Sequence, residues 1–461
     1  MNLHDLPATQ LLAYYRAKTL SPVEVSRAVL ARIAACEPQL HATYALEAEG
    51  AMRAAEASQA RWRQGAPDGP LDGVPVMVKD NIATRGTPSP LGSAATLLVP
   101  APADAPPAAR LREAGAILLG KTTMPDYGML SSGVSSFHDT ARNPWDVSRT
   151  PGGSSAGAAA GVAAGYGPLH LGTDIGGSLR LPAGWCGIFA LKPSAGRVPI
   201  DPAYYGRVAG PMTRTVQDAA LMMQVLSLPD RSDAMSLPYQ ALNWGDLQRD
   251  VKGLRIGLLL EAGCGLAVDP QVRAAVEAAA LAFAQAGAKV EIMPPFLTAQ
   301  MLDGLDLFWR QRMLAEICAM TEARRGKILP FILQWAGGVA NASGAAVFHG
   351  MSQMLAMRFA AHAAFDRHDY VLSPVAPIPA FAADLPCPGN DPVRPFGHIG
   401  FTVPFNMSDQ PAASVNCGYM DDGLPIGLQI IGQRFDDIGV LQMARAWEIM
   451  RGAQKAWPVV A

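Results

Sequence analysis

The chain has 461 residues, of which 50% are hydrophobic and 16% charged, and its formal net charge is -2. This composition supports a large buried core and excludes a disordered or fibrous protein. The near-neutral charge provides no basic surface for a nucleic acid or an anionic membrane, so a small molecule is the expected partner.

The amino-terminal segment gives no indication of export. Residues 1–20 lack a continuous apolar stretch, and nowhere do about 18 uncharged apolar residues follow one another. We therefore expect a cytoplasmic protein that does not contact a membrane. The six cysteines are widely separated and no histidines have the spacing of a metal site. Buried thiols are thus expected, with no disulfide framework and no metal.

Residues 1–65 are expected to form a helical amino-terminal region. Ser21, Pro22 and Glu24 combine an N-cap serine, a proline in the first turn and a capping glutamate. Residues 25–35 then repeat apolar side chains with the period of a helix.

From Val74 onward, short apolar segments alternate with helical patterns. Helices are expected at 106–115 and 269–287, each directly before an expected strand. Strands alternating with helices predict an α/β protein, and no linker or repeat divides residues 1–461 into separate domains. The expected strands are residues 74–78, 116–119, 169–172, 255–259, 289–293 and 370–374.

Residues 297–365 are expected to be mostly helical, and they are rich in methionine and aromatic side chains. Such side chains form either a core or the adaptable wall of an apolar binding site.

Two short motifs match catalytic patterns in an unsuitable context. Residues 115–122 match the phosphate loop G-x-x-x-x-G-K-T, but 116–119 are themselves the expected strand, whereas a phosphate loop follows its strand. Residues 153–157 match the nucleophile elbow G-x-S-x-G, which would make Ser155 the nucleophile of an α/β-hydrolase-type esterase. Residues 142–151 before it are polar and contain two prolines, so no strand leads into the motif. The esterase remains an alternative.

Three other segments each present one reactive side chain. Lys79 ends the strand expected at 74–78, and a buried lysine, unlike an arginine, can lose its proton. Ser154 precedes a helix of small residues, where an N-cap is the ordinary role. Ser178 follows the strand at 169–172 in a glycine loop, whose N–H groups could stabilise an oxyanion. Each residue alone has a structural explanation, but together they complete a Ser-Lys catalytic site.

The segments GVPVMVKDN, RTPGGSSAGAAAGVAAG and LGTDIGGSLRLPAGWCGIFALKPSAGRVP resemble the amidase signature family, and GLPIGLQIIG extends the resemblance toward the carboxyl end. The resemblance implies a single α/β/α domain around a large mixed, mostly parallel twisted sheet covered by helices. Residues 70–215 would form its signature core. It also implies hydrolysis of amides without a metal or another cofactor.

The resemblance further implies the roles of individual residues. The lysine of the family's Ser-cisSer-Lys triad falls on Lys79, the serine in a cis peptide bond on Ser154, and the nucleophile on Ser178. The oxyanion hole falls on the backbone N–H groups of Ile175, Gly176, Gly177 and Ser178.

The resemblance also indicates where the substrate would bind. By resemblance, Gly128, Met129 and Leu130 fall where family members line the substrate chamber, and residues 297–365 fall where their substrate covers diverge. The apolar residues of that region favour an aryl or alkyl amide. Arg180 is a candidate for binding a substrate carboxylate, although an arginine in such a loop more often has a structural role.

The main alternative within the family is the glutamine amidotransferase subunit that supplies ammonia for charging tRNA with glutamine. That protein functions only together with its partner chains. Leu181 and Trp185 make the region after the predicted nucleophile more apolar than glutamine hydrolysis requires, which favours a stand-alone amidase. The sequence leaves open whether the chain forms a homodimer.

Overall fold

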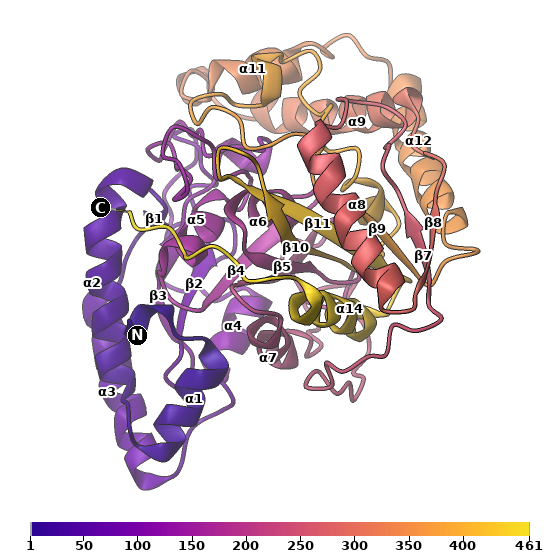
Figure 1. Cartoon of the computed structure of the whole chain (residues 1–461). Coiled ribbons are helices and arrows are strands. Elements are labelled where there is room, and N and C mark those ends of the chain that lie inside the picture. The colour runs from indigo at the N-terminus through magenta and orange to yellow at the C-terminus, as the bar shows by residue number, and fades with distance from the viewer. Residues whose placement is uncertain (1, 461) are drawn as a thin grey trace.

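A sheet of 11 strands passes through the molecule and joins segments between residues 43 and 432 (Figure 1). The structure is a computed structural model and describes residues 2–460. The strand order is β1-β3-β2-β4-β6-β5-β10-β11-β9-β7-β8. The strands are β1 (Thr43–Tyr44), β2 (Pro75–Lys79), β3 (Ile117–Thr122), β4 (Leu169–Asp174), β5 (Phe189–Lys192), β6 (Val208–Thr213), β7 (Arg255–Leu258), β8 (Lys289–Ile292), β9 (Tyr370–Pro374), β10 (Ala412–Tyr419) and β11 (Pro425–Gly432).

The six strands expected from the sequence are all present, as β2, β3, β4, β7, β8 and β9. They form all four parallel pairings of the sheet. The other six pairings are antiparallel, and each involves at least one of the strands β1, β5, β6, β10 and β11. The mixed sheet is therefore confirmed, but the expectation that it would be mostly parallel is wrong, because β6, β5, β10 and β11 alternate in direction between the two parallel groups and β1 pairs antiparallel at one edge.

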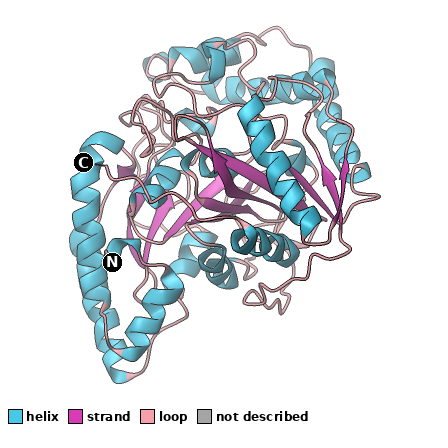
Figure 2. Ribbon diagram, viewed as in Figure 1, coloured by secondary structure: helices cyan, strands magenta, loops and turns pink. Residues whose placement is uncertain are grey.

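Helices cover both faces of the sheet. Helices α7, α8 and α14 pack on one face, and α5 and α6 pack on the other. Figure 1 shows α8 and α14 in front of the sheet, and Figure 2 shows the strands passing behind them. The helices are α1 (Ala8–Ala17), α2 (Pro22–Leu40), α3 (Ala48–Gln64), α4 (Pro106–Glu113), α5 (Ala156–Ala164), α6 (Arg180–Cys186), α7 (Val216–Leu226), α8 (Pro270–Gln285), α9 (Ala299–Cys318), α10 (Glu322–Arg325), α11 (Pro330–Gly337), α12 (Gly344–Ala363), α13 (Pro404–Met407) and α14 (Asp437–Met450), with short 3-10 turns η1 (Leu3–Asp5), η2 (Asp126–Gly128) and η3 (Pro388–Asn390).

The amino-terminal region is helical as expected, apart from the two-residue strand β1. Helix α2 begins with the predicted capping box, in which the Ser21 hydroxyl accepts from the Glu24 N–H and the Glu24 carboxylate accepts from the Ser21 N–H. Between residues 2 and 460, no helix has the length and apolar character needed to cross a membrane.

Strand β2 decides on which side of the sheet Lys79 lies. Successive side chains of a strand point to opposite faces. Val76 and Val78 pack in the core shared with α7, α8 and α14, whereas Met77 packs with α5 on the other side. Lys79, two residues after Met77, therefore points toward the α5 side. Helix α5 approaches this face so closely that a Cβ on Gly157 would collide with the backbone of Ala42 and Thr123.

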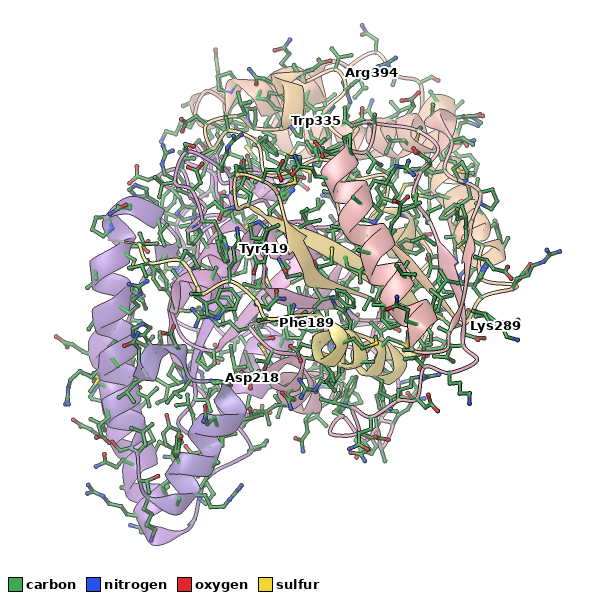
Figure 3. All side chains as sticks on the ribbon, viewed as in Figure 1. Phe189, Asp218, Lys289, Trp335, Arg394 and Tyr419 are labelled. Carbon is green, nitrogen blue, oxygen red and sulfur yellow. The ribbon has the colours of Figure 1, made fainter. Side chains whose placement is uncertain are left out.

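Helices α9 and α11 form a layer beyond one end of the sheet strands (Figure 1), and α12 extends from this layer toward the sheet, where Ala361 packs with residues of β9, β10 and β11. Helix α9 packs mainly against α12, and α11 packs on α9. Figure 3 labels Trp335 of α11 and the nearby Arg394 in this layer, on the opposite side of the molecule from Asp218 of α7. The helical character expected for residues 297–365 is confirmed.

Candidate active site

Lys79 lies at the end of β2 and is fully buried. Its Nζ atom lies 2.8 Å from the Ser154 Oγ, 3.0 Å from the Ser155 Oγ and 3.0 Å from the Thr173 Oγ1. Thr173 comes from β4, which is the parallel neighbour of β2, so the carboxyl ends of the two strands meet at one place. A single amino group is thus surrounded by three hydroxyl groups.

The burial of Lys79 controls its charge. Loss of hydration lowers the pKa of the amino group well below its ordinary value of 10.5, and the nearby Arg207 lowers the pKa further. Asp174 and Asp80 act in the opposite direction, but burial dominates. Burial therefore favours the uncharged form of the amine.

Two of the three hydroxyls have other acceptors for their protons. The Ser155 hydroxyl donates to the Thr173 carbonyl oxygen at 3.1 Å, and the Thr173 hydroxyl donates to the Asn81 side-chain oxygen at 3.4 Å. The Ser154 hydroxyl has only the Lys79 amine as a partner among the described residues. Ser154 is therefore the one of these three hydroxyls whose own proton has no other acceptor.

Ser154 and Ser155 lie in the turn before α5. The Gly153–Ser154 peptide bond is cis, as the resemblance implied. Gly128 lies so close to Ser154 that a Cβ on this glycine would stand 3.2 Å from the Ser154 Oγ. Ser155 is the N-cap residue of α5, is fully buried, and no strand precedes it. The alternative with Ser155 as the nucleophile of an esterase is therefore wrong, because its hydroxyl is held inside the protein.

Ser178 lies in the loop between β4 and α6 and retains slight exposure, at 9%. Its hydroxyl has no hydrogen-bond partner within residues 2–460. The N–H groups of Ile175, Gly176 and Ser178 likewise have no hydrogen-bond acceptor within this range. The Gly177 N–H, in contrast, donates to the Asp174 carboxylate at 2.7 Å. The expectation that Gly177 would belong to the oxyanion hole is wrong, since its donor is already used.

Arg180 braces this loop and does not face a substrate. Its guanidinium group is fully buried and bonds to both oxygens of Asp174 at 3.0 Å. Its remaining contacts are the Thr402 carbonyl and the Gln429 and Asn406 side chains. The candidate role of Arg180 in binding substrate is therefore wrong and its structural role is confirmed, because burial and these partners leave no free donor for a ligand.

Ser178 opens into a small pocket of about 30 Å³. The resemblance placed Gly128, Met129 and Leu130 in the substrate chamber, and all three line this pocket. Helix α9 contributes Trp309, whose ring lies against Gly176 so closely that a Cβ there would meet it at 2.9 Å. The complete lining consists of Gly128, Met129, Leu130, Ser131, Ile175, Gly176, Ser178, Trp309, Arg312, Phe396 and Ile399.

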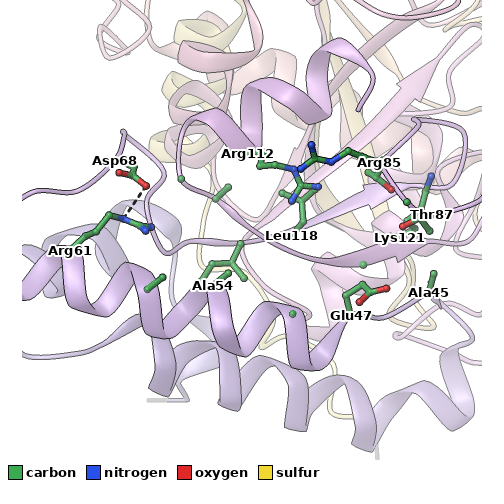
Figure 4. A pocket seen from close by; sticks show the side chains of 18 residues that line it. Ala45, Glu47, Ala54, Arg61, Asp68, Arg85, Thr87, Arg112, Leu118 and Lys121 are labelled. Carbon is green, nitrogen blue, oxygen red and sulfur yellow. Dashed lines mark ion pairs between the residues drawn. The ribbon is translucent and has the colours of Figure 1, made fainter. Parts of the chain in front are cut away.

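A larger pocket of about 580 Å³ lies between α3 and β3 (Figure 4) and shares no residue with the pocket at Ser178. It contains the segment that matches a phosphate loop, but residues 117–122 form strand β3. The Lys121 amine is buried and donates to the Ile82 carbonyl and the Ser89 hydroxyl, both at 2.8 Å. The structure confirms that this motif is not a phosphate loop. No group of three His, Cys, Asp or Glu side chains within residues 2–460 could hold a metal ion.

Sequence reasoning missed Thr173 and Asn81, which contact each other beside Lys79. A signal was available, since both residues follow the apolar part of neighbouring parallel strands. It also missed Arg312, for which no local pattern existed.

Comparisons with known proteins agree with this geometry. A sequence profile described as Amidase matches residues 24–441. One subunit of the glutamyl-tRNA(Gln) amidotransferase of Myxococcus xanthus is 37% identical over 97% of this chain and 98% of the relative. The corresponding subunit from Symbiobacterium thermophilum is 34% identical over 99% of each chain.

Solved structures are similar over the same length. A bacterial aryl acylamidase of the amidase signature family superposes with a TM-score of 0.89 at 31% identity, covering 98% of this chain and 97% of that one. A 6-aminohexanoate cyclic dimer hydrolase gives 0.87 at 26% identity, covering 100% and 98%. The chain belongs to the amidase signature family.

Proposed function

We propose that the protein is an amidase that hydrolyses aryl or alkyl amides through an acyl-enzyme on Ser178. The observation that carries this proposal is the 2.8 Å contact between the buried Lys79 amine and the Ser154 hydroxyl. A neutral amine with its lone pair directed at one hydroxyl is a general base.

In the first step, Lys79 takes the Ser154 proton while Ser154 takes the proton of Ser178. The Ser178 oxygen attacks the amide carbonyl, and the oxyanion accepts from the free N–H groups of Ile175, Gly176 and Ser178. The hydroxyls of Ser154 and Ser178 are not bonded to each other without substrate. Catalytic contacts of this kind often close only in the substrate complex.

The tetrahedral intermediate then breaks its carbon–nitrogen bond. Lys79 returns its proton through Ser154 to the nitrogen, which leaves as the amine and leaves the acyl group on Ser178. Water repeats the sequence: it loses its proton to the same relay, attacks the ester carbonyl, and the Ser178 oxygen departs with the returned proton. The products are the amine and the carboxylic acid.

The pocket lining supports an apolar substrate. Six of its eleven lining residues have apolar side chains: Met129, Leu130, Ile175, Trp309, Phe396 and Ile399. Trp309 and Phe396 also meet edge to face, with ring centroids 5.4 Å apart, a geometry that favours a planar aromatic neighbour. The similarity to an aryl acylamidase points the same way.

The second candidate is glutamine hydrolysis as one subunit of an amidotransferase, which the identity to the curated relatives favours. Glutamine carries an ammonium group that a specific site would pair with a carboxylate. None of the described residues that line the pocket at Ser178 is acidic. The stand-alone amidase is therefore the better-supported proposal. A cytoplasmic location is proposed with it, since the six cysteines are all free thiols.

A substrate panel tests the proposal directly. Purified wild type and Ser178→Ala are incubated with anilides, aliphatic amides, matched esters and glutamine, and product is quantified. We expect anilide hydrolysis by the wild type alone, without any added partner protein. Glutamine hydrolysis that exceeds anilide hydrolysis, or activity that requires a partner protein, would establish the amidotransferase role instead.

A further inference from the structure

Arg312 of α9 lines the pocket at Ser178 without an anionic partner. Among residues 2–460 no carboxylate lies within ion-pair distance of its guanidinium group, which also forms no hydrogen bond there. Its Nε atom is buried and unpaired. An unpaired buried donor is costly, so its persistence beside a catalytic pocket calls for a missing acceptor.

Arg310, two residues earlier on the same helix, shows how the chain normally treats such a group. Arg310 pairs with Asp306 at 2.7 Å and donates to three backbone carbonyls. The fully buried Arg180 is paired as well, with Asp174. Both of these buried arginines have an ion-pair partner, and Arg312 differs from them.

The surroundings of Arg312 hold it in place without neutralising it. Its guanidinium carbon lies 4.7 Å from the centre of the Tyr204 ring, and that of Arg207 lies 5.2 Å from the same ring. Arg207 forms no ion pair within residues 2–460 either; it donates to the carbonyls of Pro202 and Asn81. Two guanidinium groups without an ion-pair partner thus contact the same Tyr204 ring beside the site. Their combined positive charge attracts an anion.

We propose that Arg312 binds a carboxylate of the substrate, so that the preferred substrates are amides with an apolar body and one carboxylate group. This inference rests on the proposed amidase function and specifies its substrate class. A guanidinium group matches a carboxylate with two parallel hydrogen bonds. The apolar lining excludes water around that pair and strengthens it. Arg312 thereby takes the carboxylate-binding role that the buried Arg180 cannot fill.

Two matched substrate pairs test the inference. One pair, 4-acetamidobenzoate and the neutral 4-nitroacetanilide, varies charge on the amine side. The other, succinanilate and the neutral N-phenylbutanamide, varies charge on the acyl side. The carboxylate-to-neutral ratio of kcat/KM is compared among wild type, Arg312→Gln and Arg312→Lys, which cancels the intrinsic reactivity of each substrate. Arg325→Gln is the control, because Arg325 is an exposed arginine of α10, in the same helical region as Arg312.

For at least one pair, we expect Arg312→Gln to lower this ratio by about tenfold to a hundredfold, the effect of losing a charge-assisted hydrogen bond. Arg312→Lys should fall between, and Arg325→Gln should keep the wild-type ratio. Ratios that agree within about twofold between wild type and Arg312→Gln for both pairs would overturn the inference.

A binding measurement separates this inference from the amidase proposal. Calorimetric titration of 4-acetamidobenzoate and succinanilate into Ser178→Ala, with and without Arg312→Gln, needs no turnover. We expect the second substitution to weaken binding of the preferred carboxylate by about tenfold or more. Equal affinities of both variants for both ligands would refute the role of Arg312, whereas absence of amide hydrolysis by the wild type would refute only the proposed function.

Discussion

The Nζ atom of Lys79 lies 2.8 Å from the Oγ atom of Ser154, a residue 75 positions further along the chain. The contact joins the end of β2 to the turn before α5, at a depth where the lysine is fully buried. At that depth the protonation of the amine is set by the protein and not by bulk water, and the proposed chemistry depends on this state.

Lys79→Ala should lower kcat/KM for an anilide by at least about a thousandfold while leaving the fold intact, because it removes the base of the proton relay. Circular dichroism provides the control for folding. Variant rates within about tenfold of the wild type would exclude Lys79 as the base.

The wild type should also show a characteristic pH dependence. The base acts when deprotonated, so kcat/KM rises as pH rises through the pKa of Lys79. Because burial holds this pKa well below 10.5, the rise should end well below pH 10.5. Initial rates across a pH series check this, and a profile still rising through pH 10.5 would contradict it.

Ser178→Ala should abolish covalent labelling by a fluorophosphonate, since the labelled atom is the nucleophile itself. Ser155→Ala is the matched control, because it removes the hydroxyl that the rejected nucleophile elbow would use. We expect Ser155→Ala to remain labelled, at a reduced rate because its hydroxyl contacts Lys79. Intact-protein mass spectrometry gives the result directly. A label that survives in Ser178→Ala and disappears in Ser155→Ala would reverse the assignment.

Gly128→Ala should lower kcat by about tenfold, because the new methyl group would lie 3.2 Å from the Ser154 Oγ and displace it. Gly86→Ala separates this contact from backbone strain. Both glycines have positive φ angles, +69° and +83°, but a Cβ on Gly86 meets no atom within 4 Å. Both variants should lose similar stability in thermal unfolding, and only Gly128→Ala should lose turnover. Equal kcat values for the two variants would show that Ser154 tolerates the displacement.

Asp174→Asn should destabilise the protein by about 3–5 kcal/mol, since it leaves the buried Arg180 charge uncompensated. Burial alone would raise the pKa of Asp174, but Arg180 and Asn406 hold it below its ordinary 3.8. A carboxylate with a depressed pKa contributes its full stabilisation of the folded state above pH 3.8, and this contribution is lost as pH falls below that value.

The difference between wild type and Asp174→Asn in denaturant unfolding should therefore shrink below pH 3.8. Asp384→Asn is the control, because its pair with Arg142 is largely exposed, and it should change stability little. A difference that stays constant down to low pH would show that Asp174 is not charged in the folded protein.

Local patterns in the sequence were sufficient for a large part of the structure. The apolar segments at 74–78 and 169–172 became β2 and β4, and the capping box at Ser21 begins α2. These features were predictable because capping and side-chain alternation depend only on neighbouring residues. No helix lies between β5 and β6 or between β10 and β11. These strands therefore do not follow the strand–helix alternation, and their antiparallel pairing was not predicted.

The sequence by itself determined the family, the strands that carry the site, and the three residues Lys79, Ser154 and Ser178 as its candidates. Only the tertiary structure decided how the side chains around them are used. It committed the Gly177 N–H and Arg180 to Asp174, and it brought Arg312 of α9 into the pocket of Ser178. The physical reason is that a side chain's free donors depend on which distant groups it meets, and packing of the whole chain sets those contacts.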